Sequence, residues 1–198
     1  MKIYKRNNPV SSQALETGLF YAGVGSRKVQ GQDADIQVAI AQRLQQHSYW
    51  LFSGEATGSD TNFHEGAGDR FTTFVTHHGS KGIPMVYPIL RQAEEIASKN
   101  HPAWNRLDTY ARKLMSRNVH QVFGPWLNTP VDFVCCWTPD GCESHETRTR
   151  NTGGTGLAIS VASKANIPVV NTFNPNWSYK LSELTDIDFT DLERYESS

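Results

Sequence analysis

Two glycine-rich turns, far apart in the sequence, constrain the fold of this chain more than any other feature. The first is GVGSR at residues 23–27 and the second is TGGTG at residues 152–156. Each lies between a strand-like apolar run and a helix-like segment, which is where a parallel α/β sheet presents backbone N–H groups to phosphate. The pair of turns therefore predicts a nucleotide-binding site.

The spacing of apolar residues predicts alternating strands and helices. Runs typical of buried strands begin at Leu19, Tyr49, Val131 and Ile167. Apolar residues at helical spacing follow Asp33 and follow Ser59 or Asp60, which are acidic or hydroxyl N-cap candidates. Further helices are predicted at 91–98, at 107–123 and after the second glycine turn. This order predicts an α/β fold, a Rossmann-like, mostly parallel sheet with helices on both faces, in a single domain. For Phe71 to Leu90, a hairpin and a loop followed by a strand are both open.

The length and charge of the chain set further limits. The 198 residues suffice for one buried core. We expect an N-terminal extension at 1–17, a nucleotide-binding domain at 18–173 and a C-terminal tail at 174–198 that docks as a loop or short helix. With 19 basic and 20 acidic residues the formal charge is -1, so any site for a polyanion must be a local patch.

Three features predict a cytoplasmic protein without a membrane partner. The sequence has no apolar run long enough to cross a bilayer, and its first residues lack the apolar centre of a signal peptide. The cysteines Cys135, Cys136 and Cys142 are odd in number and crowded together, which favours a reducing compartment.

Several motifs follow one another in order between residues 18 and 172. They are YAGVGSR, SGEATGSD, the helical pair Arg117 and Asn118, the strand and turn DFVCCWTPDG, and TGGTGLAI. Together they resemble the nucleotide-binding superfamily shared by the DNA-processing protein DprA and the cytokinin-activating LOG enzymes, known as SLOG. Small stand-alone proteins with this pattern are common in phages and bacteria. The resemblance implies a Rossmann-like fold that binds a nucleotide or a nucleotide-derived ligand.

The match to DprA-like proteins is carried by two turns. Their first turn, glycine-serine-arginine, corresponds to Gly25, Ser26 and Arg27. Their second turn corresponds to Ser53, Gly54, Ala56, Gly58 and Asp60. The resemblance also implies that Arg117 and Asn118 point toward the ligand. By periodicity alone the same two residues belong to a solvated helix face.

The chemistry of the first two turns suits a nucleotide. Gly23 and Gly25 permit close approach of the backbone to a ligand, and Arg27 could form paired, charge-assisted hydrogen bonds to a phosphate. The alternative is a tight turn with Arg27 in solvent. Asp60, after Gly58 and Ser59, could accept from a ribose hydroxyl or a base, and the alternative is a plain helix N-cap.

The later turns offer further contacts. Gly153, Gly154 and Gly156 place unhindered amides at a helix N-terminus, with hydroxyls at Thr152 and Thr155, and the alternative is a purely structural turn. Thr138 and Asp140 could contact a base or ribose, while Trp137 is more typical of a core. Arg148 and Arg150 could close over phosphates as a lid, or lie on an exposed loop.

An enzyme acting on a nucleoside or nucleotide N-glycosidic bond, LOG-like or deoxyribosyltransferase-like, is the first alternative function. The chain departs from the LOG turn, with Thr152 for its proline, Leu157 for its threonine and Ser160 for its catalytic glutamate. A replacement acid would be Glu65, or after it Glu146.

The second alternative is a DprA-like protein that binds single-stranded DNA. Charge could come from Arg106, Arg112, Lys113 and Arg117, and stacking from Trp104 and Trp126. The apolar segments around these two tryptophans could equally pair two copies in a homo-oligomer, or be core. We expect no cofactor and no metal site, because Cys135 and Cys136 are adjacent on a strand and point to opposite faces.

Overall fold

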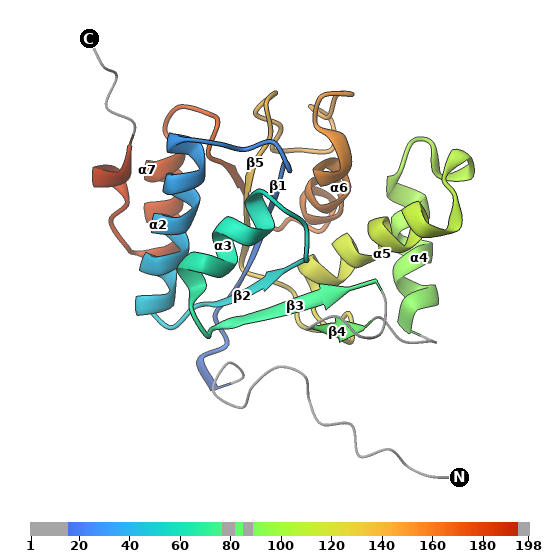
Figure 1. Ribbon diagram of the computed structural model, residues 1–198, viewed down its shortest axis with the longest axis horizontal. Coiled ribbons are helices and arrows are strands. Elements are labelled where there is room, and N and C mark those ends of the chain that lie inside the picture. The colour runs from blue at the N-terminus through green and yellow to red at the C-terminus, as the bar shows by residue number, and fades with distance from the viewer. Residues whose placement is uncertain (1–15, 77–81, 85–88, 194–198) are drawn as a thin grey trace.

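The computed structural model describes residues 16–76, 82–84 and 89–193. In this part of the chain a parallel sheet has the strand order β4-β3-β2-β1-β5-β6 (Figure 1). The strands are β1 (Phe20–Gly25), β2 (Trp50–Ser53), β3 (Phe71–Val75), β4 (Ile83–Pro84), β5 (Phe133–Trp137) and β6 (Val169–Asn171). The helices are α2 (Gln32–Gln46), α3 (Ser59–Ala67), α4 (Ile89–Asn100), α5 (Thr109–Phe123), α6 (Gly156–Lys164) and α7 (Trp177–Thr185). Short 3₁₀ turns are η1 (Trp104–Arg106), η2 (Gly153–Thr155) and η3 (Thr190–Leu192).

The strands are added first on one side of β1 and then on the other, so the strand order reverses between β1 and β5. From β1 the strands run outward through β2, β3 and β4, and the chain then returns to pair β5 with the other side of β1. Gly25 at the end of β1 is in register with Trp137 at the end of β5. In a doubly wound sheet the ligand site lies outside the carboxyl ends of the strands at this reversal. The Rossmann-like prediction is therefore confirmed, and it places the site beside β1 and β5.

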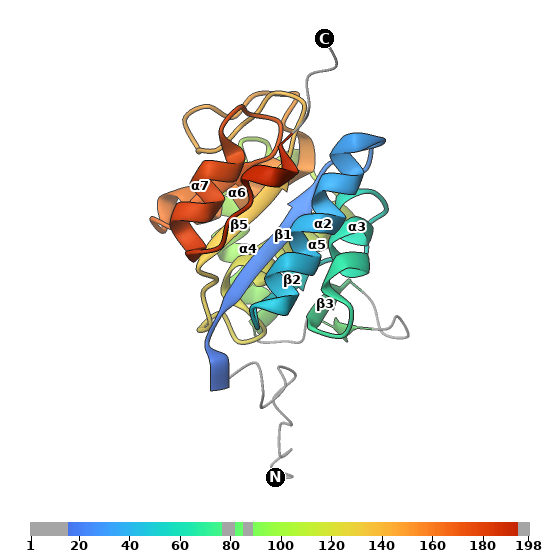
Figure 2. The same cartoon turned by 90° about the vertical axis from the view of Figure 1, so that its left-hand side faces the viewer.

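Two layers of helices cover the sheet because its strands are apolar on both faces. In β1, Tyr21 packs toward α2, α3 and α7, while Ala22 packs toward α4, α5 and α6. Figure 2 views the face that α2, α3 and α7 cover. Within that layer the rings of Tyr21 and Phe133 stack at 5.8 Å between centroids. The core is thus continuous on both sides of the central strands, and it holds their carboxyl ends rigidly.

The segment between Phe71 and Leu90 resolves one open alternative. Phe74 of β3 pairs with Ile83 of β4 in parallel, so the hairpin is wrong and the loop followed by a strand is confirmed. Residues 77–81 and 85–88 of the same segment lie outside the described residues. The sequence could not decide this point, because an apolar run of this length pairs equally well in either direction.

The residues after Asn174 form a short helix, α7, that docks on the sheet. Trp177 and Leu181, one helical turn apart, are buried with Ile187 and Phe189 in the cluster beneath α2. Arg43 of α2 also binds the Asp188 carbonyl at 2.5 Å. The expectation of a docked short helix is met, and its apolar face belongs to the main core. Among the described helices, none is long and apolar enough to cross a membrane.

Candidate functional site

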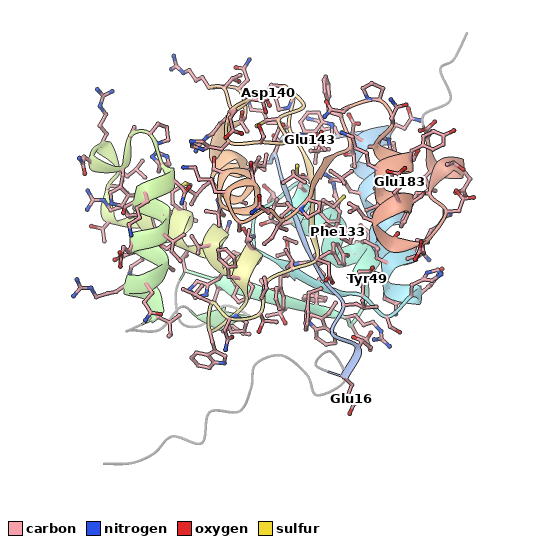
Figure 3. The ribbon with its side chains drawn as sticks, turned by 180° about the vertical axis from the view of Figure 1, so that it is seen from behind. Glu16, Tyr49, Phe133, Asp140, Glu143 and Glu183 are labelled. Carbon is pink, nitrogen blue, oxygen red and sulfur yellow. The ribbon has the colours of Figure 1, made fainter. Side chains whose placement is uncertain are left out.

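The turns that follow β1, β2 and β5 meet at the carboxyl edge of the sheet. The Ser26 amide donates to the Trp137 carbonyl at 3.1 Å, and the Ser59 amide donates to the Ser26 carbonyl at 3.2 Å. From the helical layer, the Asn118 amide group donates to the Gly154 carbonyl at 3.0 Å. We call this group of turns, residues 26–31, 54–58 and 138–156 with Arg117 and Asn118, the carboxyl-edge site. Figure 3 shows Asp140 at this edge of the molecule and Glu16 at the opposite edge.

The turn after β1 packs tightly against the start of α3. A Cβ on Gly25 would meet the Ser59 hydroxyl, and one on Gly58, where φ is 81°, would lie 2.6 Å from the Ser26 carbonyl oxygen. The buried Ser59 hydroxyl donates to that same carbonyl at 3.2 Å and accepts from Gln37 at 3.0 Å. Gly25, Gly58 and Ser59 therefore build the turn itself. The N-cap of α3 is Gly58, so neither Ser59 nor Asp60 caps this helix.

The N-cap of α2 is Gly31, whose φ is 57°, and not Asp33. Both α2 and α3 therefore begin at a glycine with positive φ, a backbone conformation in which a side chain is disfavoured. The predicted acidic and hydroxyl N-caps are therefore wrong, because the backbone of each turn requires a glycine.

Gly23 and Ser53 lie below the surface of the site. The Ser53 hydroxyl donates to the Gly23 carbonyl at 2.6 Å, which ties β2 to β1. A Cβ on Gly23 would lie 2.6 Å from the Phe63 ring of α3. Both residues are buried, so their positions are explained by the close packing of the two strands and the helix.

Arg117 and Asn118 are buried, each with 8% of its surface exposed, and the expectation of a solvated helix face is wrong. The reason is that α5 is covered on two sides. Val119 and Val122 face the sheet, while the polar side of the same helix packs under the turn after β2 and against η2. Periodicity detects the apolar side only, so it misses the burial of this pair.

Arg117 and Asp60 form a buried ion pair directly under Gly54. The distance from Nη2 of Arg117 to Oδ2 of Asp60 is 3.8 Å, and a Cβ on Gly54 would lie 2.7 Å from Cζ of Arg117. Burial raises the pKa of Asp60 to about 6, and this effect outweighs the attraction of Arg117 and the N–H groups of Ala56 and Gly54. Asp60 is therefore a carboxyl group that changes charge near neutral pH beside a fixed cation.

The Arg117 guanidinium is incompletely paired. Its Nε has no hydrogen-bond partner in residues 16–76, 82–84 and 89–193, and its ionic contact with Asp60 is longer than a hydrogen bond. A buried guanidinium usually has most of its donors satisfied by carboxylate, carbonyl or phosphate oxygens. This side chain consequently has capacity for an additional anion.

The second glycine turn is open, in contrast to the first. A Cβ on Gly153 would meet no atom within 4 Å, and one on Gly154 would meet only the Met115 methyl at 3.6 Å. A Cβ on Gly156, by comparison, would lie 2.5 Å from Nε of Arg148. Gly153 and Gly154 are thus the exposed part of the turn, immediately before the N-terminus of α6, where backbone N–H groups attract anions.

Asp140 holds the loop that leads to this turn. Its carboxylate accepts from the hydroxyls of Thr149 at 2.5 Å and Thr152 at 2.6 Å. Partial desolvation raises the pKa of Asp140, but hydrogen bonds from Thr149, Thr152 and Thr138 more than offset it and lower the pKa below its ordinary value. The ionised carboxylate therefore organises residues 139–152. Thr155, at the end of η2, is largely buried.

Thr138 is turned into the protein. Its hydroxyl accepts from the Asn171 side chain at 2.7 Å and from the Cys142 amide at 3.2 Å, and it has no exposed surface. Asn171, at the end of β6, was not expected from the sequence, yet it also donates to the Cys142 carbonyl at 2.9 Å. An asparagine at the end of an apolar strand is the signal that could have identified this anchor.

The arginines near the site differ in position. Arg148 donates to the Asn100 carbonyl at 3.0 Å and to the Ser160 hydroxyl at 3.3 Å, so it joins α4 to α6. It packs against Gly156 at the end of the glycine turn and not against the open Gly153 and Gly154. Arg27 and Arg150 are exposed. Arg148 is therefore held in the structure, whereas the exposed side chain of Arg150 could reach a ligand at Gly153 and Gly154.

The two candidate catalytic acids lie away from the open glycines. Glu65 is exposed on α3, five residues after Asp60, which places it about 7.5 Å further along the helix axis from the carboxyl edge. Glu146 is exposed in a loop. The amide of the preceding residue, His145, donates to the Ser163 hydroxyl near the C-terminal end of α6. Neither carboxylate shares a described contact with the residues that surround Gly153 and Gly154.

The three cysteines are free and buried. Cys135 belongs to the core cluster on the α2 side of the sheet and Cys136 to the cluster on the α6 side. Among the described histidines, cysteines, aspartates and glutamates, no group of three is arranged to hold a metal ion.

Two adjoining cavities lie outside the carboxyl-edge site, beside η1. The larger, of about 630 Å³, is lined by residues of α4 and α5 and by Trp104. The smaller, of about 540 Å³, is lined by Ser98 and residues 101–106. Arg112 lies over the Trp104 ring, with Cζ 5.5 Å from the centroid, so an aromatic ring and a cation face this region together.

Comparisons with known proteins identify the fold. No family model matches the chain, and no curated protein matches it. A solved structure of DNA processing protein A from Helicobacter pylori, described for its unique mode of binding single-stranded DNA, is similar, with a TM-score of 0.54 and 17% identity over 82% of this chain and 68% of that chain. This chain therefore has the α/β Rossmann-like fold that is also found in DNA processing protein A.

Proposed function

We propose that the carboxyl-edge site binds the phosphate of a nucleotide or of a nucleotide-derived ligand. The observation that carries the proposal is the buried and incompletely paired guanidinium of Arg117. It lies next in sequence to Asn118, which holds the open glycine turn through the Gly154 carbonyl. A cation and a helix N-terminus that converge on one edge form a site for an anion.

The arrangement assigns different tasks to the turns. Gly153 and Gly154 form a stretch of backbone that no side chain shields, immediately before the N-terminus of α6, and Arg27 and Arg150 supply positive charge at the exposed rim. The first turn, with Gly25 and Gly58, keeps the β1 loop in place. Binding of this kind requires no catalytic residue.

The test is to titrate the purified protein with a panel of nucleoside mono-, di- and triphosphates and to measure binding by calorimetry and by thermal shift. Arg117→Gln should lower affinity about tenfold or more, because a hydrogen bond to a charged group contributes about 1.5–3 kcal/mol. Lys113→Gln on the same helix removes the same charge and is the matched control. Equal affinity in both variants would contradict a role for Arg117.

Binding of single-stranded DNA is a second candidate function. The structurally similar DNA processing protein A is described as binding it, which supports the proposal by fold alone. The cavities beside Trp104 add an aromatic ring covered by Arg112, with Arg91 and Arg106 among the lining residues. Aromatic rings and cations along a groove are what a single strand requires.

This candidate is tested with a fluorescent oligothymidylate at several salt concentrations. Trp104→Ala should weaken binding, and the affinity should fall steeply with salt, since phosphate contacts release counterions. Tyr110→Ala, which removes an aromatic side chain that is 61% exposed at the start of α5, is the control. Affinity that is insensitive to both salt and Trp104 would exclude this surface as the DNA site.

A further inference from the structure

Phe173 is an exposed aromatic side chain at the carboxyl edge of the sheet. It follows β6, and 43% of its surface is exposed. Its ring contacts the ring of Trp137, the last residue of β5, with centroids 6.0 Å apart and planes at 82°. The loop after β6 lies at the same edge as the loop after β5 in both views of the chain (Figures 1 and 2). The exposed part of this ring is therefore an apolar surface that a ligand at this edge could contact.

The backbone around Phe173 is firmly held. Its amide donates to the Asn171 side chain at 3.1 Å, and the preceding Thr172 amide donates to the Cys136 carbonyl at 2.8 Å. On the other side, the Asn174 side chain donates to the Gly141 carbonyl at 2.9 Å. The ring is therefore presented from a fixed frame, and little conformational entropy would be lost when a ligand contacts it.

The aromatic pair is close to the open glycine turn. A Cβ on Gly141 would lie 3.3 Å from the Phe173 ring, so the ring packs against Gly141. The preceding residue, Asp140, accepts from Thr152 at 2.6 Å, and Thr152 directly precedes Gly153. Consecutive Cα atoms are about 3.8 Å apart. Two adjacent residues, Asp140 and Gly141, thus connect the ring to the turn.

We infer that Phe173, supported by Trp137, stacks against the aromatic base of the ligand whose phosphate binds at Gly153 and Gly154. The inference rests on the proposed nucleotide-binding function and adds a base subsite to it. Stacking uses the face of the base, which purines and pyrimidines share, so the subsite recognises an aromatic base without selecting one by its hydrogen-bonding edge. The phosphate and base contacts together define a nucleotide, whereas the glycine turn alone accepts any phosphate.

The experiment compares two ligands by calorimetry, a nucleoside 5′-monophosphate and ribose 5-phosphate, which lacks the base. Phe173→Ala should lower affinity for the nucleotide about tenfold and leave affinity for ribose 5-phosphate unchanged. Phe173→Trp should retain nucleotide binding, because it keeps a stacking surface. Tyr179→Ala, which removes an aromatic side chain that is 58% exposed on α7, is the matched control and should change neither affinity.

The outcomes separate this inference from the function on which it rests. If Phe173→Ala binds the nucleotide as tightly as the wild type while Arg117→Gln does not, the base subsite is wrong and the phosphate site stands. If the wild type binds the nucleotide no more tightly than ribose 5-phosphate, the base is not recognised and the inference also fails. If the wild type binds neither ligand, both the proposed function and this inference are wrong.

Discussion

The side chain of Asn118 on α5 donates a hydrogen bond of 3.0 Å to the carbonyl of Gly154 in the glycine turn before α6. The bond joins two segments that are 36 residues apart in the sequence, and it is made from a buried position. It fixes the Gly154 carbonyl, while a Cβ at this position would meet only the Met115 methyl, so the backbone of the turn is open there. In the proposed site, Asn118 would therefore act on a ligand through the position of the turn.

Asn118→Ala should both destabilise the protein and weaken nucleotide binding. The loss of a buried hydrogen bond predicts a decrease of about 1–2 kcal/mol in the free energy of unfolding, measured by urea denaturation. Affinity should fall more than in Ser116→Ala, which removes a hydrogen bond only within α5. If both variants bind equally well, the Gly154 contact does not position the turn for a ligand.

Gly58→Ala should be far more destabilising than Gly31→Ala. Both glycines are helix N-caps with positive φ, 81° and 57°. Only at Gly58 would the new Cβ also collide with the Ser26 carbonyl oxygen and Arg27, while Gly31 has no atom within 4 Å. We expect about 1 kcal/mol for Gly31→Ala from backbone strain and about 3 kcal/mol or more for Gly58→Ala. Equal midpoints in chemical denaturation would show that the two turns are not packed as described.

Anion binding should depend on pH through Asp60. The pKa of this carboxyl group is raised by burial to about 6, so it is ionised above that pH and partly neutralises Arg117. As the pH falls through about 6, protonation removes the competing charge. Affinity for a phosphodiester, whose own charge is constant in this range, should therefore increase. Asp60→Asn should bind more tightly at neutral pH and lose the pH dependence, whereas Asp35→Asn, at an exposed position of α2, should behave as the wild type does.

The contribution of His64 to the stability of the protein should decrease on mild acidification. Burial lowers the pKa of this imidazole to about 4, and its ring stacks on Phe71 at 4.5 Å between centroids. The unfolded chain, with a pKa near 6.5, then binds more protons, so the contribution of His64 is complete above about pH 6.5 and is lost as the pH falls toward 4.

His64→Gln should reduce the slope of unfolding free energy against pH in that window. Some slope should remain, since burial also lowers the pKa of His120. Asp60 acts in the opposite direction, because its raised pKa favours the folded state as the pH falls through about 6. His47→Gln, at an exposed position, is the control. An unchanged slope in His64→Gln would show that His64 protonates alike in both states.

The alternation of strands and helices could be predicted because most of the strands are short apolar runs and most of the helices have apolar residues at helical spacing. The strand around Tyr21, buried on both faces, and the small-residue helix α6 are examples. The pairing direction of β3 and β4 could not be predicted, because a short apolar run is compatible with pairing in either direction. The burial of Trp177 and Leu181 was missed, although their i,i+4 spacing is a helical signal.

The site was only partly predictable. The sequence indicates which turns meet, since the carboxyl ends of parallel strands share an edge. It does not distinguish a glycine required for packing, such as Gly58, from one left open, such as Gly154, because both are small residues in a turn. It also gives no reason to separate Phe173 from the apolar strand before it. These distinctions arise from tertiary contacts, which no local pattern contains.

The most direct test of the account is calorimetric titration of Gly154→Asp with the nucleotide that the wild type binds best. A side chain at this position has room, since only the Met115 methyl lies within 4 Å of its Cβ, so the variant should melt as the wild type does. The added carboxylate should abolish nucleotide binding, while Gly154→Ala should retain it within a few-fold. Undiminished binding by a folded Gly154→Asp would show that the ligand does not bind at the glycine turn, and the account would be wrong.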